Sequence, residues 1–188
     1  MEPHITPNDL QMFYKYLDKA TNYFEFGAGG STYQASKRTN LERIVCVESD
    51  SKWINKVKES IGNDTRITYI HIDINAVGTL WGRPGPKSTL EDWKKYSSAI
   101  CDSNLPKMDF VLIDGRFRVA CCLKCFNMLD ENAFIAFDDF LNRPTYHVVL
   151  NYFEIVEKTA DKTMVILKKR LTNAPPAELI EKYEKEFE

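Results

Sequence analysis

The sequence lacks the long apolar runs and the charge imbalance that would indicate a membrane or a nucleic acid as partner. It has no stretch of about 18 consecutive apolar residues, the length that a membrane-spanning helix needs. Its first residues, Met1-Glu2-Pro3-His4, do not follow the basic and then apolar plan of a signal peptide. The 25 Lys and Arg residues and 27 Asp and Glu residues give a formal net charge of −2, so no basic field exists for a phosphate backbone. We therefore expect a soluble, cytoplasmic protein, with neither nucleic acid nor a membrane indicated as partner.

Cysteine is also scarce, and its spacing indicates no disulfide framework or zinc ribbon. The five residues are Cys46, Cys101, Cys121, Cys122 and Cys125. The last three suggest a metal at first sight, but on a helix Cys122 points about 100° away from the face that Cys121 and Cys125 share. Because free cysteine is commonly a core residue, we expect small buried hydrophobic side chains in a reducing compartment.

The order of apolar runs predicts one α/β domain over residues 1–188. A length of 188 residues with 44% hydrophobic residues suits a single core. Short β-branched and aromatic runs alternate with segments of helical period, which is typical of a parallel sheet covered on both faces. The predicted parallel strands are 23–26, 44–48, 67–72, 108–114 and 133–137. The predicted helices are 31–38, 51–61, 117–129 and, opened by Pro144, 144–150.

Two further apolar runs, 152–156 and 163–167, are close enough to form an antiparallel hairpin. The predicted fold is therefore a Rossmann-like, doubly wound sheet, mostly parallel and seven-stranded, that ends in an antiparallel hairpin. Residues 172–188 are rich in Lys and Glu and indicate a polar tail, either a solvated helix or a frayed end.

Residues 75–105 are too many for a simple connection, and they include Trp81, Trp93 and Tyr96. Long excursions in compact domains are usually functional loops or disorder, and the aromatic content argues against disorder. We expect a folded cap insertion beside the site. Trp81 and Trp93 either shape an acceptor pocket or form a small core of the cap itself.

The most informative segment is the glycine loop Gly27-Ala28-Gly29-Gly30, which joins a predicted strand to a predicted helix. Glycines allow a sharp turn and a close approach to a ligand, and the helix start offers free N–H groups. A dinucleotide fingerprint would need a third glycine at position 32, where Thr32 stands. The loop alone is also compatible with a tight turn that binds nothing.

Two carboxylates follow at the ends of the next strands. Glu48 lies 21 residues after Gly27, a spacing that suits the ribose hydroxyls of any adenosine-containing ligand. Asp73 closes the third strand at the same carboxyl edge. Either residue alone could be a helix cap or a turn residue.

In this order, residues 25–30, Glu48, Asp73 and residues 109–114 resemble the successive motifs of class I S-adenosylmethionine-dependent methyltransferases. The resemblance spans residues 20 to 170 and implies S-adenosylmethionine as cofactor. It implies that Glu25 and the loop face the methionine part, Glu48 the ribose and Asp73 the adenine amino group. The implied cofactor-binding residues are Glu25, Gly27, Ala28, Gly29, Gly30, Ser31, Glu48 and Asp73. Residues 26–32, 81–84 and 113–121 also resemble a group of small methyltransferase-like proteins.

Three more carboxylates, Asp114, Asp138 and Asp139, follow the fourth and fifth predicted strands. At the mouth of the site they could hold Mg²⁺ or another divalent cation, as in the metal-dependent sugar and small-molecule O-methyltransferases that the pattern resembles. Arg116 stands where that group tends to have a further Asp. The alternative is a metal-free site in which these residues orient helices or act as bases.

Arg116 and Arg118 allow two interpretations: they grip an anionic acceptor, or they pair with the three carboxylates. His147 is a minor candidate for a base.

The hypothesis from the sequence is methyl transfer to the oxygen of a saccharide or other small hydroxyl acceptor. Its candidate catalytic residues are Asp114, Asp138, Asp139 and Arg116. The alternatives are a cofactor-binding module without acceptor chemistry and a nicotinamide-dependent oxidoreductase.

Overall fold

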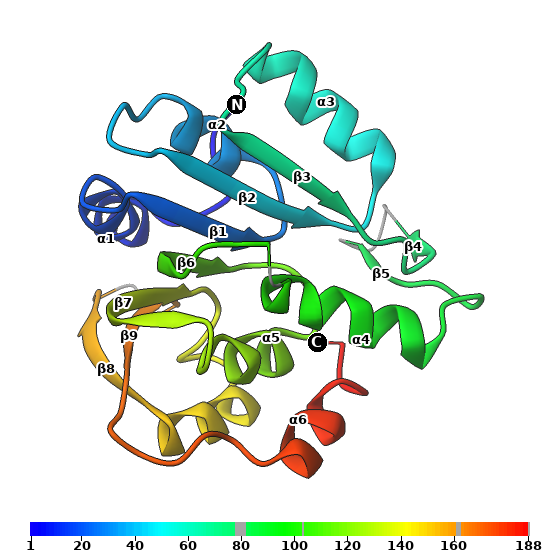
Figure 1. The fold of residues 1–188 in the computed structure, drawn as a ribbon, viewed down its shortest axis with the longest axis vertical. Coiled ribbons are helices and arrows are strands. Elements are labelled where there is room, and N and C mark those ends of the chain that lie inside the picture. The colour runs from blue at the N-terminus through cyan, green and yellow to red at the C-terminus, as the bar shows by residue number, and fades with distance from the viewer. Residues whose placement is uncertain (78–81, 103, 161–162, 188) are drawn as a thin grey trace.

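The computed structural model describes residues 1–77, 82–102, 104–160 and 163–187. A seven-stranded sheet runs through the molecule in the order β3-β2-β1-β6-β7-β9-β8 (Figure 1). Its strands are β1 (Asn22–Phe26), β2 (Arg43–Glu48), β3 (Ile67–His71), β6 (Met108–Ile113), β7 (Leu129–Phe137), β8 (Phe153–Lys158) and β9 (Val165–Lys169). The first five are parallel, whereas β9 is antiparallel to both β7 and β8. The predicted fold class is therefore confirmed, including the hairpin at its end.

Helices cover both faces of this sheet. The α-helices are α1 (Pro7–Leu17), α2 (Gly30–Ser36), α3 (Ser51–Ile61), α4 (Leu90–Ser98), α5 (Arg118–Cys125) and α6 (Ala177–Tyr183), and the longer 3₁₀ helix is η3 (Pro144–Asn151). Successive side chains of a strand point to opposite faces. In β1, Tyr23 packs in the core with Phe13 of α1, whereas Phe24 and Phe26 belong to the opposite core with Val119 of α5. The continuous apolar strand sequences follow from burial on both faces.

Several boundaries differ from the sequence-based prediction. The expected helix 117–129 ends at Cys125, and β7 already begins at Leu129. The start of β7 was missed because residues 130–132 are polar and exposed. The expected α-helix 144–150 is a 3₁₀ helix, and α1 was not predicted.

Residues 75–105 contain a small pair of antiparallel strands and a helix that packs against the core of the main sheet. β4 (Ala76–Val77) pairs antiparallel with β5 (Arg83–Pro84), and α4 follows. Tyr96 of α4 is 2% exposed, and its ring centroid lies 6.0 Å from that of Phe26. The ring centroid of Trp93 lies 5.6 Å from that of Phe117. These aromatic residues therefore pack into the main core rather than forming a separate core of a cap. Trp81 lies outside the described residues.

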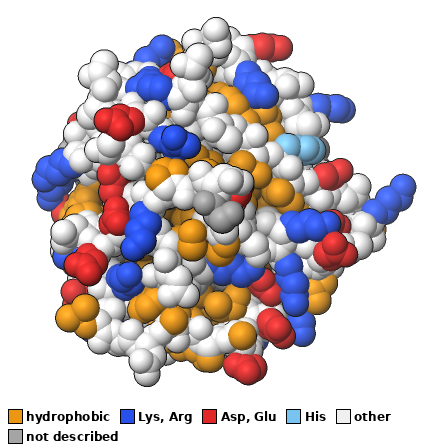
Figure 2. Space-filling model, in the orientation of Figure 1, with side chains coloured by type: hydrophobic (Ala, Val, Ile, Leu, Met, Phe, Trp, Pro, Cys, Tyr) orange, Lys and Arg blue, Asp and Glu red, His pale blue; other side chains and the backbone are white. Residues whose placement is uncertain are grey.

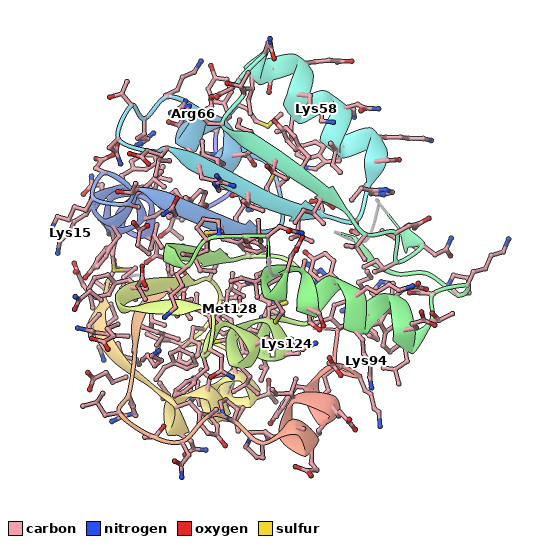
Figure 3. All side chains as sticks on the ribbon, viewed as in Figure 1. Lys15, Lys58, Arg66, Lys94, Lys124 and Met128 are labelled. Atoms are coloured by element: carbon pink, nitrogen blue, oxygen red, sulfur yellow. The ribbon has the colours of Figure 1, made fainter. Side chains whose placement is uncertain are left out.

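The expected polar tail contains a docked helix. Figure 1 shows α6 beside α5 and α4, and Figure 3 labels Lys124 of α5 and Lys94 of α4 in this region. Glu184, directly after α6, is only 3% exposed and forms an ion pair with Lys124. The Lys124 ammonium also donates to Ser97 Oγ at 3.0 Å. One acidic residue of the tail is thus buried and pairs with α5, which holds α6 in place.

The cysteines agree in part with their prediction. Cys46, Cys121, Cys122 and Cys125 are buried as expected, whereas Cys101 is exposed. Figure 2 shows basic and acidic side chains interspersed on the visible face. Within the described residues, no helix combines the length and the hydropathy required to cross a membrane.

Candidate functional site

A cavity of about 1180 Å³ lies at the carboxyl edge of the sheet. Open α/β sheets bind their ligands at this edge because the strand-to-helix loops meet there. The segments after four neighbouring strands contribute to it: the glycine loop after β1, Ser49 and Asp50 after β2, residues 114–116 after β6, and Asp138 and Asp139 after β7. The predicted convergence of the strand ends is therefore present in the structure.

The glycine loop requires glycine at its first position. Gly27 has a φ of +98°, and a Cβ there would lie 3.2 Å from the carbonyl carbon of Asp114 and from Cα of Gly115. Its N–H donates to Val47 O at 2.9 Å. The loop is thereby held against β2 and against the segment that follows β6. Ala28, Gly29, Gly30 and Ser31 line the cavity along with it.

Glu25 lies beneath this loop and does not line the cavity. It is fully buried, and its carboxylate accepts hydrogen bonds from Tyr23 Oη at 2.9 Å and from Thr32 Oγ1. Burial raises the pKa of Glu25 to about 7. Thr32 also accepts from the N–H of Gly29 at 2.8 Å. The residue that replaces the third glycine therefore links the loop to Glu25, and Glu25 supports the loop from below.

Glu48 joins the loop to the end of β2. Its Oε2 accepts from the N–H of Ala28 at 3.1 Å, and its Oε1 accepts from the N–H groups of Ser49 at 2.6 Å and Asp50 at 3.0 Å. Burial raises its pKa against these hydrogen bonds. Glu48 lines the cavity as predicted. Asp73, by contrast, is exposed, accepts from the N–H of Asn75 at 2.7 Å and is not among the lining residues.

Trp53 of α3 is a cavity residue that the sequence reasoning missed. Its Nε1 donates to Ala28 O at 2.7 Å, and a Cβ on Gly29 would lie 3.8 Å from its ring. The buried face of α3 is formed by Ile54 and Val57. The Trp53 side chain lies outside this face and is 37% exposed. A large aromatic residue outside the apolar face of a helix was the available signal.

The N-terminal segment, residues 1–5, was also missed. It lines the cavity next to the glycine loop, and Figure 1 places the N-terminus beside α2. A Cβ on Gly30 would lie 2.3 Å from the carbonyl carbon of Glu2 and from the nitrogen of Pro3. The absence of a side chain at Gly30 therefore admits the backbone of this segment. No local sequence pattern indicates such a contact.

At the other end of the cavity, Arg118 lies among the three predicted carboxylates. Its Nη2 is 3.0 Å from Asp114 Oδ1, and its Nη1 is 3.4 Å from Asp139 Oδ2 and 3.9 Å from Asp138 Oδ2. The guanidinium also donates to Gly115 O at 3.0 Å and to Asp138 O at 2.9 Å. Arg118 is 4% exposed. For this residue the structure supports pairing with the carboxylates.

Two of the carboxylates near Arg118, Asp114 and Asp138, have raised pKa values. Burial raises the pKa of Asp138, the neighbouring Asp114 raises it further, and Arg118 opposes the shift. Burial likewise raises the pKa of Asp114, against the attraction of Arg118. Two carboxyl groups that disfavour each other's ionisation can share one proton, which provides both a proton acceptor and a proton donor at this end of the cavity.

The donor set at this end does not match a divalent cation. The described parts of the chain contain no group of three or more His, Cys, Asp and Glu side chains arranged to hold a metal ion. Arg118 already contacts the three carboxylates that would be needed, and Arg143 Nη2 contacts Asp139 Oδ2 at 3.0 Å. A cation bound to the same oxygens would have to displace these guanidinium groups.

Two residues at this end of the cavity adopt the left-handed conformation that non-glycine residues rarely take. Phe117 has a φ of 53° and Asp139 a φ of 56°. Phe117 is fully buried against Trp93 and Tyr96. Such strained turns persist only where the surroundings hold them, and they cluster at functional sites. His147 packs on Phe140 and does not line the cavity.

Comparisons with known proteins agree with this geometry at the level of the fold. No protein-family model matches the chain. A search of curated proteins also finds no match. Among solved structures, a methyltransferase-like protein from Silicibacter pomeroyi DSS-3 is similar with a TM-score of 0.86 and 23% identity, over 98% of this chain and 97% of that one.

Two further structures are more distant in sequence. The N-methyltransferase NodS from Bradyrhizobium japonicum WM9, in complex with S-adenosyl-L-homocysteine, has a TM-score of 0.56 at 13% identity, over 87% of this chain and 85% of NodS. A ribosomal protein L11 methylase from Lactobacillus delbrueckii subsp. bulgaricus has a TM-score of 0.58 at 12% identity, over 90% and 82%. These neighbours and the strand order agree: the chain has the fold of the class I S-adenosylmethionine-dependent methyltransferases.

Proposed function

We propose that this protein is an S-adenosylmethionine-dependent methyltransferase that methylates an oxygen of a saccharide or other small hydroxyl compound. The observation that carries the proposal is a single cavity with two different ends. One end has the glycine loop with Glu48 and Trp53, and the other has Asp114, Asp138 and Asp139. Its volume of about 1180 Å³ exceeds the roughly 300–1,000 Å³ of common ligand sites, so it has room for cofactor and acceptor together.

The first end fits an adenosyl cofactor. Gly29 carries no side chain and only the Trp53 ring lies near that position, Glu48 offers a carboxylate at the ribose position, and the Trp53 ring forms one side of the cavity. The N-terminal segment lies over the same loop and would cover part of a bound cofactor. The S-adenosyl-L-homocysteine bound in NodS supports the choice of this cofactor class.

When bound, the cofactor supplies an electrophilic methyl group, whose carbon bonds to the acceptor oxygen while its bond to the sulfonium sulfur breaks and leaves a neutral thioether. Such a transfer depends mainly on in-line positioning of the reacting atoms. The acceptor hydroxyl must also lose its proton. Asp114, whose ionised form is favoured by the Arg118 guanidinium 3.0 Å away, would accept that proton at the cavity wall.

The donor set of the second end supports a metal-free mechanism. Arg118 supplies the positive charge that a divalent cation would otherwise provide to Asp114, Asp138 and Asp139. In this proposal the three carboxylates are kept in place by Arg118 and Arg143, and deprotonation requires no cation.

Calorimetry tests the cofactor and a transfer assay tests the reaction. We expect S-adenosyl-L-homocysteine and S-adenosylmethionine to bind at one site per chain and NAD not to bind. Binding of NAD in their place would favour an oxidoreductase. Transfer of labelled methyl groups from the cofactor to small hydroxyl compounds would distinguish an enzyme from a cofactor-binding module, for which binding persists without transfer.

A further inference from the structure

Arg116 and Arg118 are two residues apart but have different surroundings. Arg118 is buried in the carboxylate cluster described above. Arg116 lines the cavity and is partly buried. In the described part of the chain, no carboxylate forms an ion pair with Arg116. Burial and, to a lesser extent, the nearby Arg118 lower the pKa of Arg116, against the attraction of Asp114.

The backbone holds the two arginines apart. Phe117, between them, is in the left-handed conformation with a φ of 53°, and its ring centroid lies 5.6 Å from that of Trp93 and 5.8 Å from that of Tyr96. On the other side of Arg116, a Cβ on Gly115 would lie 2.2 Å from Tyr96 Oη. Core packing therefore fixes the turn, and Arg116 cannot join the carboxylate cluster without disturbing it.

The nearby carboxylates compensate the charge of Arg116 only in part, because their side chains pair with other arginines. Asp114, Asp138 and Asp139 are engaged by Arg118, and Asp139 is contacted by Arg143 as well. A guanidinium partly removed from water is stabilised when it finds an anion. Its planar fork matches a carboxylate or a phosphate group, each of which can accept two parallel hydrogen bonds.

We infer that the acceptor is an anion: a small hydroxyl compound that carries a carboxylate or phosphate group, which binds Arg116 while its hydroxyl lies towards Asp114. This inference rests on the proposed function, because it assigns the acceptor of that same site. Arg116 then selects the acceptor and Arg118 organises the carboxylates. Of the two interpretations that the sequence left open, binding of an anionic acceptor then applies to Arg116, and pairing with the carboxylates applies to Arg118.

The test uses the full chain saturated with S-adenosyl-L-homocysteine, with inorganic phosphate and acetate as separate probes in calorimetry at constant ionic strength. Arg116→Gln keeps much of the length and the polarity of the side chain and removes its charge. Arg43→Gln removes an equivalent charge from the exposed start of β2, at the opposite edge of the sheet, and is the matched control. The affinity of each variant for S-adenosyl-L-homocysteine reports whether the cavity is intact.

We expect phosphate or acetate to bind the loaded wild-type protein, R116Q to weaken that binding at least about tenfold, and R43Q to leave it unchanged. The anion that binds with the higher affinity indicates whether the acceptor carries a phosphate or a carboxylate group. If neither anion binds, or if R116Q binds it as well as wild type, the inference is wrong while the proposed function stands. If S-adenosyl-L-homocysteine itself fails to bind the wild type, the proposed function fails and the anionic acceptor fails with it.

Discussion

Pro3 occupies the space in which a side chain on Gly30 would lie. A Cβ on Gly30 would be 2.3 Å from the Pro3 nitrogen, so the N-terminal segment and the glycine loop fit together only while residue 30 is glycine. Pro3 and Gly30 are 27 residues apart in the sequence. It places the first residues of the chain at the wall of the cavity.

Gly30→Ala should therefore displace the N-terminal segment, because the new methyl group would overlap the backbone of Glu2 and Pro3. We expect faster hydrogen exchange at the amides of residues 4–6 and weaker binding of S-adenosyl-L-homocysteine. Gly29→Ala is the control for exchange, since a Cβ there would meet only the Trp53 ring at 3.8 Å, an ordinary contact distance. Unchanged exchange in G30A would show that the segment does not depend on Gly30.

Arg118→Met should destabilise the fold, because it leaves Asp114, Asp138 and Asp139 close together without their cation. Breaking a buried ion pair by removing one partner costs about 3–5 kcal/mol. Urea unfolding at neutral pH measures this change. Arg118→Lys keeps the charge but not the planar fork, and should lose less. A change of under about 1 kcal/mol in R118M would contradict the role given to Arg118.

Asp138→Asn should change how stability depends on pH. The raised pKa of Asp138 means that the folded protein retains a proton that the unfolded chain releases. The wild type therefore loses stability as the pH rises from the ordinary range of Asp through this raised value. The side-chain amide of the variant does not titrate, so D138N should lose less over the same range.

Urea unfolding at several pH values tests the effect of D138N, with Asp130→Asn as control. Asp130 lies at the exposed start of β7, and its variant should follow the wild-type pH dependence. If the free energy of unfolding changed equally with pH in D138N and in wild type, the effect of burial on Asp138 would be contradicted.

Asp114→Asn should reduce methyl transfer while leaving cofactor binding intact. The amide keeps the shape of the side chain but accepts no proton, and a positioned general base contributes about 100-fold or more. We expect kcat to fall by about that factor, with the affinity for S-adenosyl-L-homocysteine within about twofold of wild type. Unchanged turnover would remove Asp114 from the mechanism.

Lys124→Met should loosen the C-terminal helix, since it removes the nearer of the two ammonium groups that pair with the buried Glu184 and leaves only Lys94, 3.8 Å away. Glu184 has 4% side-chain exposure and Lys124 has 12%. We expect a loss of about 3 kcal/mol in the free energy of unfolding, within the usual range for a broken buried pair. Lys95→Met breaks the exposed pair with Glu91, 2.9 Å apart, and should leave the stability almost unchanged, because water screens an exposed ion pair. Equal effects of the two variants would contradict the docking of α6.

Much of the fold could be predicted from the sequence because its signals are local. The apolar runs of β1, β2 and β6 reflect burial on both faces of a sheet, and parallel strands bring their carboxyl ends to one edge. That rule placed Gly27, Glu48 and Asp114 around one cavity before any contact was known. The missed α1 also had local signals, since Thr6 caps it by accepting from the N–H of Asp9 and Pro7 stands at its start.

The roles of individual residues were decided by tertiary structure. Glu25 supports the loop from below rather than lining the cavity, and Asp73 lies outside it, although both fit the same sequence motif. Arg116 and Arg118 are chemically identical, and only the core packing around Phe117 sends one into the carboxylate cluster and leaves the other at the cavity wall. The sequence by itself determined the sheet, the loop and the set of charged groups at its edge. Which of those groups meet was decided by contacts between distant segments, because electrostatic partners are set by distance in space and not by distance along the chain.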